Sequence, residues 1–326
     1  MPVETTKVQE QEKHSQQPTA FTLRSIAFSH YNEKARWGLD YYKVPYIEYR
    51  SLPICHMISM FKYKAKARPP GPGASVFVTP HLTVEHNSNN DSKEKEKETI
   101  ILNDSKKILE FLSDQYAAPA NSNGKSSAPP NLYSNDEASK AKIQALEERF
   151  NTMIGPHVRR VVYYEVLLHS PRSVARSLGQ HDNAGKLQSW IWSLFLPIFV
   201  WMLCKAMHVN ETSAARSRDV LKREFEHLSR VLESGPPGPA YLVGNQFTAA
   251  DLTLASLGGL AVGVTNEDGY GAWVPSIQDM ARPEGRKFME ELRATTAGQH
   301  IMECYKLHRG HKVPGSGYGF SFFGLW

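Results

Sequence analysis

Residues 21–49 read FTLRSIAFSHYNEKARWGLDYYKVPYIEY. The first seven of them have extended character, and a helical run begins near Asn32, where small and apolar side chains recur every three or four positions. Residues 46–50 predict a second strand, because Ile47 and Tyr49 share one face of an extended chain. The stretch therefore predicts a strand, a helix and a second strand in immediate succession.

The residues that follow complete a small α/β unit. Apolar and polar side chains alternate over 81–85, and 99–102 is another short β-rich run, so two more strands are expected. The charged segment NSNNDSKEKEKE at 87–98 indicates an enlarged, solvent-exposed loop between them. A helix with one apolar face is expected over 105–116. We therefore expect an α/β domain over residues 21–116.

The second half of the chain has a different character. Residues 117–139 are rich in Ala, Pro, Ser, Asn and Gly, which predicts a linker. From 140 to 309 apolar residues follow helical spacing and no strand pattern remains, so an all-helical domain is expected. Residues 1–20 are polar and lack the apolar core of a signal sequence, which predicts a disordered tail. Residues 310–326 form a Gly-rich, aromatic tail whose position the sequence does not fix.

Composition limits the classes of function. A chain of 326 residues with 41% hydrophobic and 22% charged residues is an ordinary globular mixture, long enough for two domains. The formal net charge of +5 is small and dispersed, so no nucleic-acid partner is expected. Three cysteines without a CxxC pair argue against a disulfide scaffold and a structural zinc site. We expect no metal and a reducing, cytoplasmic location.

One apolar segment raises the question of a membrane. Residues 190–207 read WIWSLFLPIFVWMLCKAM, with Pro197 inside, and no charge occurs from Leu187 to Cys204. About 15 uncharged apolar residues in a helix span only ~22 Å, which is short of a hydrocarbon layer of ~30 Å. We therefore expect a buried or interface helix, with a membrane-dipping segment as the less favoured alternative.

Three short motifs carry residues suited to binding a peptide-like anion. Ser29 stands just before a predicted helix, where its hydroxyl can cap backbone amides and where the helix dipole favours an anion such as a thiolate. Pro80 fits a strand boundary or a cis bond that presents the backbone of Thr79 to an extended ligand. Asp104 and Ser105 begin the next helix, as caps or as groups that hold an amino-acid end. Taken singly, each motif is more simply explained by local structure.

In this order the motifs resemble those of a known family. The thioredoxin-like N-terminal domain of glutathione transferases is similar to this chain in SHYNEKARWGLDYYKVPYIEY (29–49), VTPHL (78–82) and ILNDSKKILEFL (101–112). In the second half, YLVGNQFTAADLTLA (241–255) resembles the capping-box segment of that family's C-terminal domain, with Thr248 and Asp251 in S/T-x-x-D spacing. The resemblance implies a thioredoxin-like domain followed by an all-helical domain of the glutathione transferase (GST) type.

The resemblance also implies an activity and its residues. It implies a transferase that joins glutathione, as co-substrate, to a small, apolar electrophile in detoxification. The Ser29 hydroxyl matches the group that hydrogen-bonds the glutathione sulfur, and the backbone of Thr79, before Pro80, matches the part that pairs with the cysteinyl unit. Asp104 and Ser105 match the residues that bind the γ-glutamyl end. A homodimer is expected only by analogy. Candidates for the acceptor pocket are the Trp190 region and Arg159, Arg160, Tyr163 and Tyr164.

Several positions depart from the family pattern. His30 stands where many members carry proline, and Asn32 stands where a related branch often carries cysteine. The basic residue that members usually carry just before the proline motif is absent, because Phe77 and Val78 stand there. A lysine or arginine within 62–68 could supply this charge. Without a cysteine at position 29 or 32, thiol–disulfide chemistry is not expected. Two alternatives stay open: a non-catalytic, GST-like binding or regulatory protein, and a membrane-associated, GST-like protein.

Overall fold

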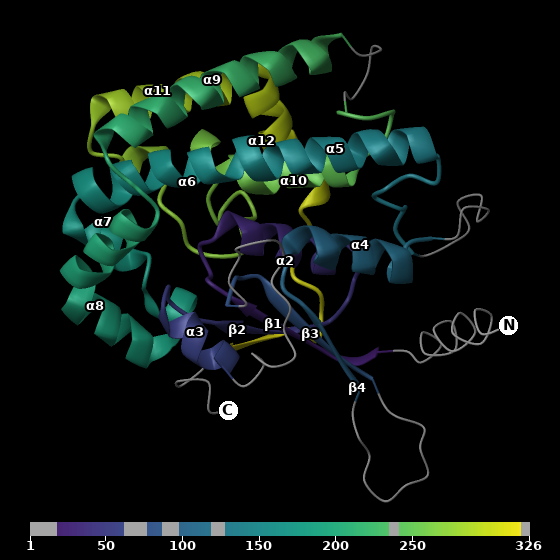
Figure 1. Cartoon of the computed structure of the whole chain (residues 1–326), viewed down its shortest axis with the longest axis horizontal. Helices are drawn as coiled ribbons and strands as arrows, with labels where there is room; N and C mark the ends of the chain where they lie inside the picture. The colour runs from purple at the N-terminus through teal and green to yellow at the C-terminus, as the bar shows by residue number, and fades with distance from the viewer. Residues whose placement is uncertain (1–17, 62–76, 87–97, 119–127, 235–240, 321–326) are drawn as a thin grey trace, which may run out of the picture.

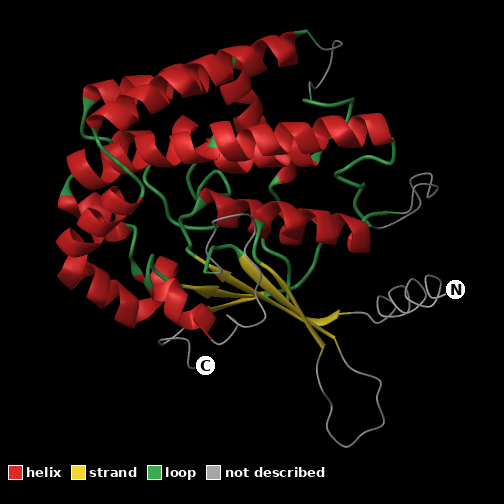
Figure 2. Cartoon of the chain, in the orientation of Figure 1, coloured by secondary structure: helices red, strands yellow, loops and turns green. Residues whose placement is uncertain are grey.

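The sheet is built from the first third of the chain and one strand from its C-terminal segment (Figures 1 and 2). The computed structural model describes the whole chain apart from residues 1–17, 62–76, 87–97, 119–127, 235–240 and 321–326. The elements of the N-terminal domain are β1 (Pro18–Ser25), α2 (His30–Tyr41), β2 (Ile47–Arg50), α3 (Cys55–Met60), β3 (His81–His86), β4 (Glu98–Leu102) and α4 (Ser105–Tyr116).

The strand order of the sheet is β4-β3-β1-β2-β5. β1 and β2 are parallel, so they need a crossover connection, which α2 supplies. β3 pairs antiparallel with both β1 and β4. Figure 1 shows α2 and α4 between the sheet and most of the helical second half of the chain, whereas α3 lies directly beside the strands. This is the thioredoxin-like arrangement expected for residues 21–116.

A close contact between α2 and α4 holds this layer together. Leu109 and Leu112 on α4 are fully buried against the sheet and α2. A Cβ atom at Gly38 on α2 would come within 2.8 Å of Leu109 Cδ1, so a glycine at this position lets the two helices approach.

The second half of the chain is helical, as expected, and covers the α2 and α4 side of the sheet (Figure 1). α10 lies at its centre and is buried along its whole length, which explains why its sequence is mostly apolar. The elements are α5 (Glu137–Met153), α6 (Gly155–Tyr163), a π-helical turn η2 (Tyr164–His169), α7 (Arg172–Ser177), α8 (His181–Ala206), α9 (Glu211–Glu233), α10 (Ala249–Gly258), the 3₁₀ turns η3 (Gly259–Val262) and η4 (Ile277–Asp279), α11 (Pro283–Ala294) and α12 (Thr296–His308).

The expected capping box is present at the start of α10. Asp251 Oδ2 accepts from the Thr248 backbone N–H at 3.0 Å and from the Thr248 hydroxyl at 2.7 Å. Its other oxygen accepts from the backbone N–H of Leu242 at 2.9 Å and lies 3.0 Å from His300 Nε2. A fully buried carboxylate with this many partners fixes the entry to the central helix.

Some boundaries differ from the sequence-based expectation. β1 begins at Pro18, inside the stretch expected to be a tail, and α5 begins at Glu137, inside the expected linker 117–139. The 310–326 tail contains β5 (Gly317–Phe320), which pairs in parallel with β2 at the edge of the sheet. Glycines at two of its four positions hid this strand, since glycine is rare in strand patterns.

Helix α8 is buried on one side only. Trp192, Leu196, Phe199 and Leu203 pack into the core, whereas the large apolar side chains between them are exposed. Pro197 cannot donate to the preceding turn, and Phe195 has non-helical dihedrals, which places a kink there. α8 is therefore not a core helix, and its exposed apolar side fits both an interface helix and the membrane-dipping alternative.

The charged residues of the SHYNEKARW stretch are structural. Glu33 accepts from Arg36 Nε at 2.9 Å and from Arg309 Nε at 2.7 Å, and Arg36 also donates to Glu48 at 2.7 Å. Burial alone would raise the pKa of Glu33, but the two arginines outweigh it and lower that pKa. Lys34 pairs with Glu147 of α5 at 2.8 Å. The Glu33–Arg309 and Lys34–Glu147 pairs join the first domain to the helical domain.

Candidate functional site

The three motifs converge at the edge of the sheet where β1 and β4 end and β3 begins. Arg24 near the end of β1 pairs with His81 at the start of β3, and Leu82 pairs with Leu102 at the end of β4. The loops that carry residues 26–29, 77–80 and 103–104 therefore leave the sheet on the same side. The strand register thus gathers Ser29, Thr79, Pro80, Asp104 and Ser105 along this edge.

Ser29 occupies the N-cap position of α2 without acting as its cap. Its backbone is extended, its N–H donates to the carbonyl of Ile26 at 2.9 Å, and its side chain makes no capping hydrogen bond. The half-buried hydroxyl therefore stands at the positive end of a helix dipole, free to donate to an anion.

Asn32 connects the start of α2 to the loop before β3. Its amide Nδ2 donates to Thr79 Oγ1 at 3.1 Å and to the carbonyl of Ile26 at 3.2 Å. The Thr79–Pro80 peptide bond is cis, which is one of the two alternatives that the sequence left open. Asn32 thus holds the Ser29 loop and the Thr79 loop at a fixed separation.

Asp104 is the N-cap of α4, and Ser105 is buried in its first turn. Asp104 Oδ1 accepts from the backbone N–H groups of Lys106 at 2.8 Å and Lys107 at 3.1 Å. Both bonds use the same oxygen, so Oδ2 can still accept from a ligand ammonium group. The capping interpretation and the binding interpretation are compatible at this residue.

His30 and Tyr31 seal the site against the helical domain. Burial, and secondarily the charge of Arg159, lowers the pKa of His30 to about 3, so the imidazole is neutral. Burial raises the pKa of Tyr31 to about 12, and its hydroxyl donates to the Asn151 carbonyl at 3.1 Å. A Cβ at Gly155 would lie 2.1 Å from the Tyr31 hydroxyl oxygen, so α6 begins in direct contact with Tyr31.

Arg159 is the cation of this site. It lies one turn after Gly155 and one turn before Tyr163 on the face of α6 that meets Tyr31. Its charge acts on His30, Tyr31 and Tyr163 alike, and its buried Nε has no hydrogen-bond partner. An arginine in this state is suited to a carboxylate.

The other acceptor-pocket candidates lie apart from one another. Arg160 acts on His157, whose Nδ1 lies 3.0 Å from Ser217 Oγ on α9. Tyr163 is buried beside Arg159, with a pKa raised to about 12 by burial. Tyr164 points toward α11, where its hydroxyl accepts from Arg282 at 3.0 Å. Tyr163 therefore lies with Arg159, whereas the structure places Arg160 and Tyr164 toward other helices.

None of the three cysteine thiols is activated. Burial raises the pKa of all three thiols. His300 Nε2 contacts both Asp251 at 3.0 Å and Cys304 at 3.4 Å, so one nitrogen serves both and no acid–base relay exists.

Within the described ranges no group of three or more His, Cys, Asp or Glu side chains is placed to hold a metal. The lysines and the arginine within 62–68 lie outside the described residues.

Comparison with known proteins gives matches among solved structures alone. No protein-family model and no curated protein matches the chain. Similar structures are a variant of poplar glutathione transferase F1 (17% identity, 88% of this chain and 99% of that chain, TM-score 0.48) and glutathione transferase Omega 2S from Trametes versicolor (15%, 90% and 89%, 0.45). Another is maleylacetoacetate isomerase from Anaeromyxobacter dehalogenans, with bound GSH (17%, 92% and 100%, 0.39). Since these TM-scores are below 0.5, the fold assignment rests on the chain's own strand order and helical second half.

Proposed function

We propose that the protein is a glutathione transferase that conjugates the glutathione thiolate to a small, apolar electrophile. The observation that carries the proposal is the Ser29 hydroxyl, which makes no capping hydrogen bond at the N-terminus of α2. It lies at the same edge of the sheet as Thr79, Pro80, Asp104 and Ser105. A free thiol has a pKa near ~8.5, and lowering it by one or two units corresponds to ~1.4 to 2.7 kcal/mol of preference for the thiolate.

The peptide part of glutathione fits the remaining groups of this edge. The backbone of Thr79 pairs with the cysteinyl unit, and Asp104 Oδ2 and the Ser105 hydroxyl receive the γ-glutamyl end. Arg159 supplies the cation that a tripeptide with two carboxylates needs, in place of the basic residue missing before Val78.

The chemical step needs no general base from the protein. The bound thiol releases its proton to solvent, and Ser29 donates a hydrogen bond to the sulfur anion. The thiolate then attacks the electrophilic carbon, forming a C–S bond as the leaving group departs with its electron pair. We assign Tyr163, beside Arg159, to the wall of the acceptor pocket.

A second candidate is a non-catalytic binding protein of the same fold. The observations that favour it are the departures from the family pattern at His30, Asn32 and Val78. This protein would bind glutathione weakly or not at all and would leave its thiol pKa unchanged.

Titration of the bound thiol separates the two. Thiolate absorbance of the glutathione complex, followed against pH, should give a pKa one to two units below the free value of ~8.5. Ser29→Ala should return the pKa toward that value and lower conjugation of an aryl halide roughly 10- to 100-fold, because it removes a hydrogen bond to a charged group. The exposed Ser173 provides the control Ser173→Ala. An unshifted thiol pKa in the wild-type complex supports the binding protein instead.

A further inference from the structure

Helix α8 presents a continuous apolar face to the outside of the molecule. Trp190 and Trp201 are 62% and 61% exposed, which is far more than core residues allow. Figure 1 shows α8 at the periphery, away from α9 and α11. The exposed side chains recur every three or four residues, so most of them form one stripe along the helix: Trp190, Leu194, Phe195, Ile198 and Trp201. We call this set the α8 face.

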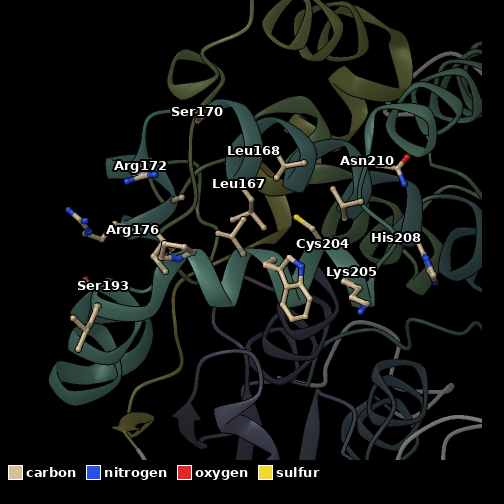
Figure 3. A pocket seen from close by; sticks show the side chains of 17 residues that line it. Leu167, Leu168, Ser170, Arg172, Arg176, Ser193, Cys204, Lys205, His208 and Asn210 are labelled. Carbon is tan, nitrogen blue, oxygen red and sulfur yellow. The ribbon is translucent and has the colours of Figure 1, made fainter.

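A cavity of about 980 Å³ adjoins the α8 face. It lies between η2, α7 and α8, with Leu167, Leu194 and Trp201 among its apolar lining. Figure 3 shows basic side chains around it: Arg172 and Arg176 from α7, and Lys205 and His208 from the end of α8.

The charge around the α8 face has one sign. The residues that line the cavity include no Asp or Glu, and no carboxylate occurs between Asp182 and Glu211. Among the ion pairs of the described part of the chain, none involves Arg172, Arg176 or Lys205. Lys205 Nζ instead lies 5.0 Å from the centre of the Trp201 ring. An apolar stripe flanked by unpaired cations complements an anionic, amphipathic surface.

We propose that the α8 face rests on a lipid bilayer with anionic headgroups, with α8 lying in the plane of the interface. Tryptophans near both ends of the stripe fit this position, because indole rings favour the headgroup level. α8 is long and apolar enough to cross a membrane by length and composition. It is held on the body of the protein, however, by buried Trp192 and by Gln188, whose Oε1 accepts from the backbone N–H of Leu52 at 2.8 Å.

Charge also argues against a second copy of this chain as the occupant. A two-fold contact through the α8 face would place Arg172, Arg176 and Lys205 of each copy near the same residues of the other. No carboxylate of this face would compensate them, so the like charges would repel. A bilayer that contains acidic lipids supplies the missing negative charge.

Vesicle sedimentation of the full-length protein tests the proposal. Phosphatidylcholine vesicles with and without roughly 30% phosphatidylserine are compared, at about 0.05 M and about 0.5 M salt. We expect binding to the acidic vesicles, weaker binding at high salt, and little binding to neutral ones. The triple variant Arg172→Gln/Arg176→Gln/Lys205→Gln should bind roughly 100-fold more weakly, since each cation near the surface contributes about fivefold.

Matched variants separate the α8 face from general surface effects. Trp190→Gln/Trp201→Gln should lower binding at least about tenfold, because it removes buried apolar area. Val231→Gln/Leu307→Gln changes exposed apolar residues on α9 and α12, and Lys142→Gln/Arg223→Gln/Lys306→Gln changes cations elsewhere; both should bind as wild type. Circular dichroism confirms that each variant is folded.

Three results overturn the proposal. The first is absence of binding to acidic vesicles by the folded wild-type protein. The second is equal loss of binding in the α8 variants and their controls. The third is a protein that forms dimers in sedimentation equilibrium, loses them in Trp190→Gln/Trp201→Gln and ignores vesicles, which assigns the α8 face to a second copy. Glutathione binding is not required for any of these measurements.

Discussion

His30 is a buried imidazole whose proton affinity differs between the folded and unfolded chain. Its pKa falls from 6.5 to about 3 on folding, through burial and then Arg159. Between these values the unfolded chain binds a proton that the folded protein does not, so stability is complete above about pH 6.5 and declines as the pH falls toward 3. His30→Asn should flatten this decline in a plot of unfolding free energy against pH. The same slope in wild type and variant would show that His30 is protonated in the folded protein.

Arg159 and Arg160 offer a test between neighbouring residues. The helix breaks at Ile154, before α6, so the face that each arginine occupies cannot be extrapolated from the preceding helix in the sequence. Arg159→Gln should weaken glutathione binding roughly tenfold, as loss of a charged hydrogen bond does, and should raise the pKa of His30. Arg160→Gln should change neither. Calorimetric titration and NMR of the imidazole measure the two effects, and equal responses of the two variants would reject the role of Arg159.

Among the elements, α9 and α10 begin with capping boxes in opposite environments. Asp251 is fully buried and has partners in Leu242, Thr248 and His300, whereas Asn210 caps α9 in solvent. Asp251→Ala leaves several buried groups unsatisfied, so it should cost about 3 kcal/mol or more in unfolding free energy. Asn210→Ala should cost about 1 kcal/mol. Urea denaturation of both variants gives the comparison; similar losses would mean that burial adds nothing to the Asp251 cap.

Elements with strong local patterns were predictable from the sequence, and those set by distant contacts were not. β3 follows an apolar–polar alternation, β1, β2 and β4 are short runs of β-forming residues, and α4 follows a regular apolar stripe. β5 contains glycine at two positions and exists because the edge of β2 lies open to it. The partly exposed side of α8 was equally hidden, because periodicity cannot separate a core helix from one with an apolar outer face.

The candidate site divides in the same way. Ser29, Pro80 and Asp104 stand at element boundaries that the sequence marks, so their common sheet edge could be anticipated. Asn32 and Arg159 act across loops and domains, and nothing local in their spacing shows the partner. The role of Asn32 depends on the loop before β3, and that of Arg159 depends on the contact between Tyr31 and the start of α6.

At the scale of the whole molecule, the Lys34–Glu147 ion pair is fully buried between the two domains. Lys34 on α2 and Glu147 on α5 are 0% exposed, and Thr253 on α10 donates to the same Glu147 oxygen at 3.2 Å. The elements that meet here belong to the sheet domain and to the centre of the helical domain, so the pair couples their folding. Separating the two domains would therefore leave Lys34 and Glu147 each without its charged partner.

Breaking and replacing this pair should have opposite effects. Lys34→Met strands Glu147 without a cation and should lower the unfolding free energy by about 3 to 5 kcal/mol, whereas Lys34→Met/Glu147→Leu should recover most of the loss because an apolar pair needs no compensation. The surface pair Lys222–Glu291 is 48% and 44% exposed, so Lys222→Met should cost under about 1 kcal/mol. Urea unfolding followed by tryptophan fluorescence measures all three. A double variant as unstable as Lys34→Met would mean that the charges themselves, rather than the burial of one unpaired charge, hold the domains together.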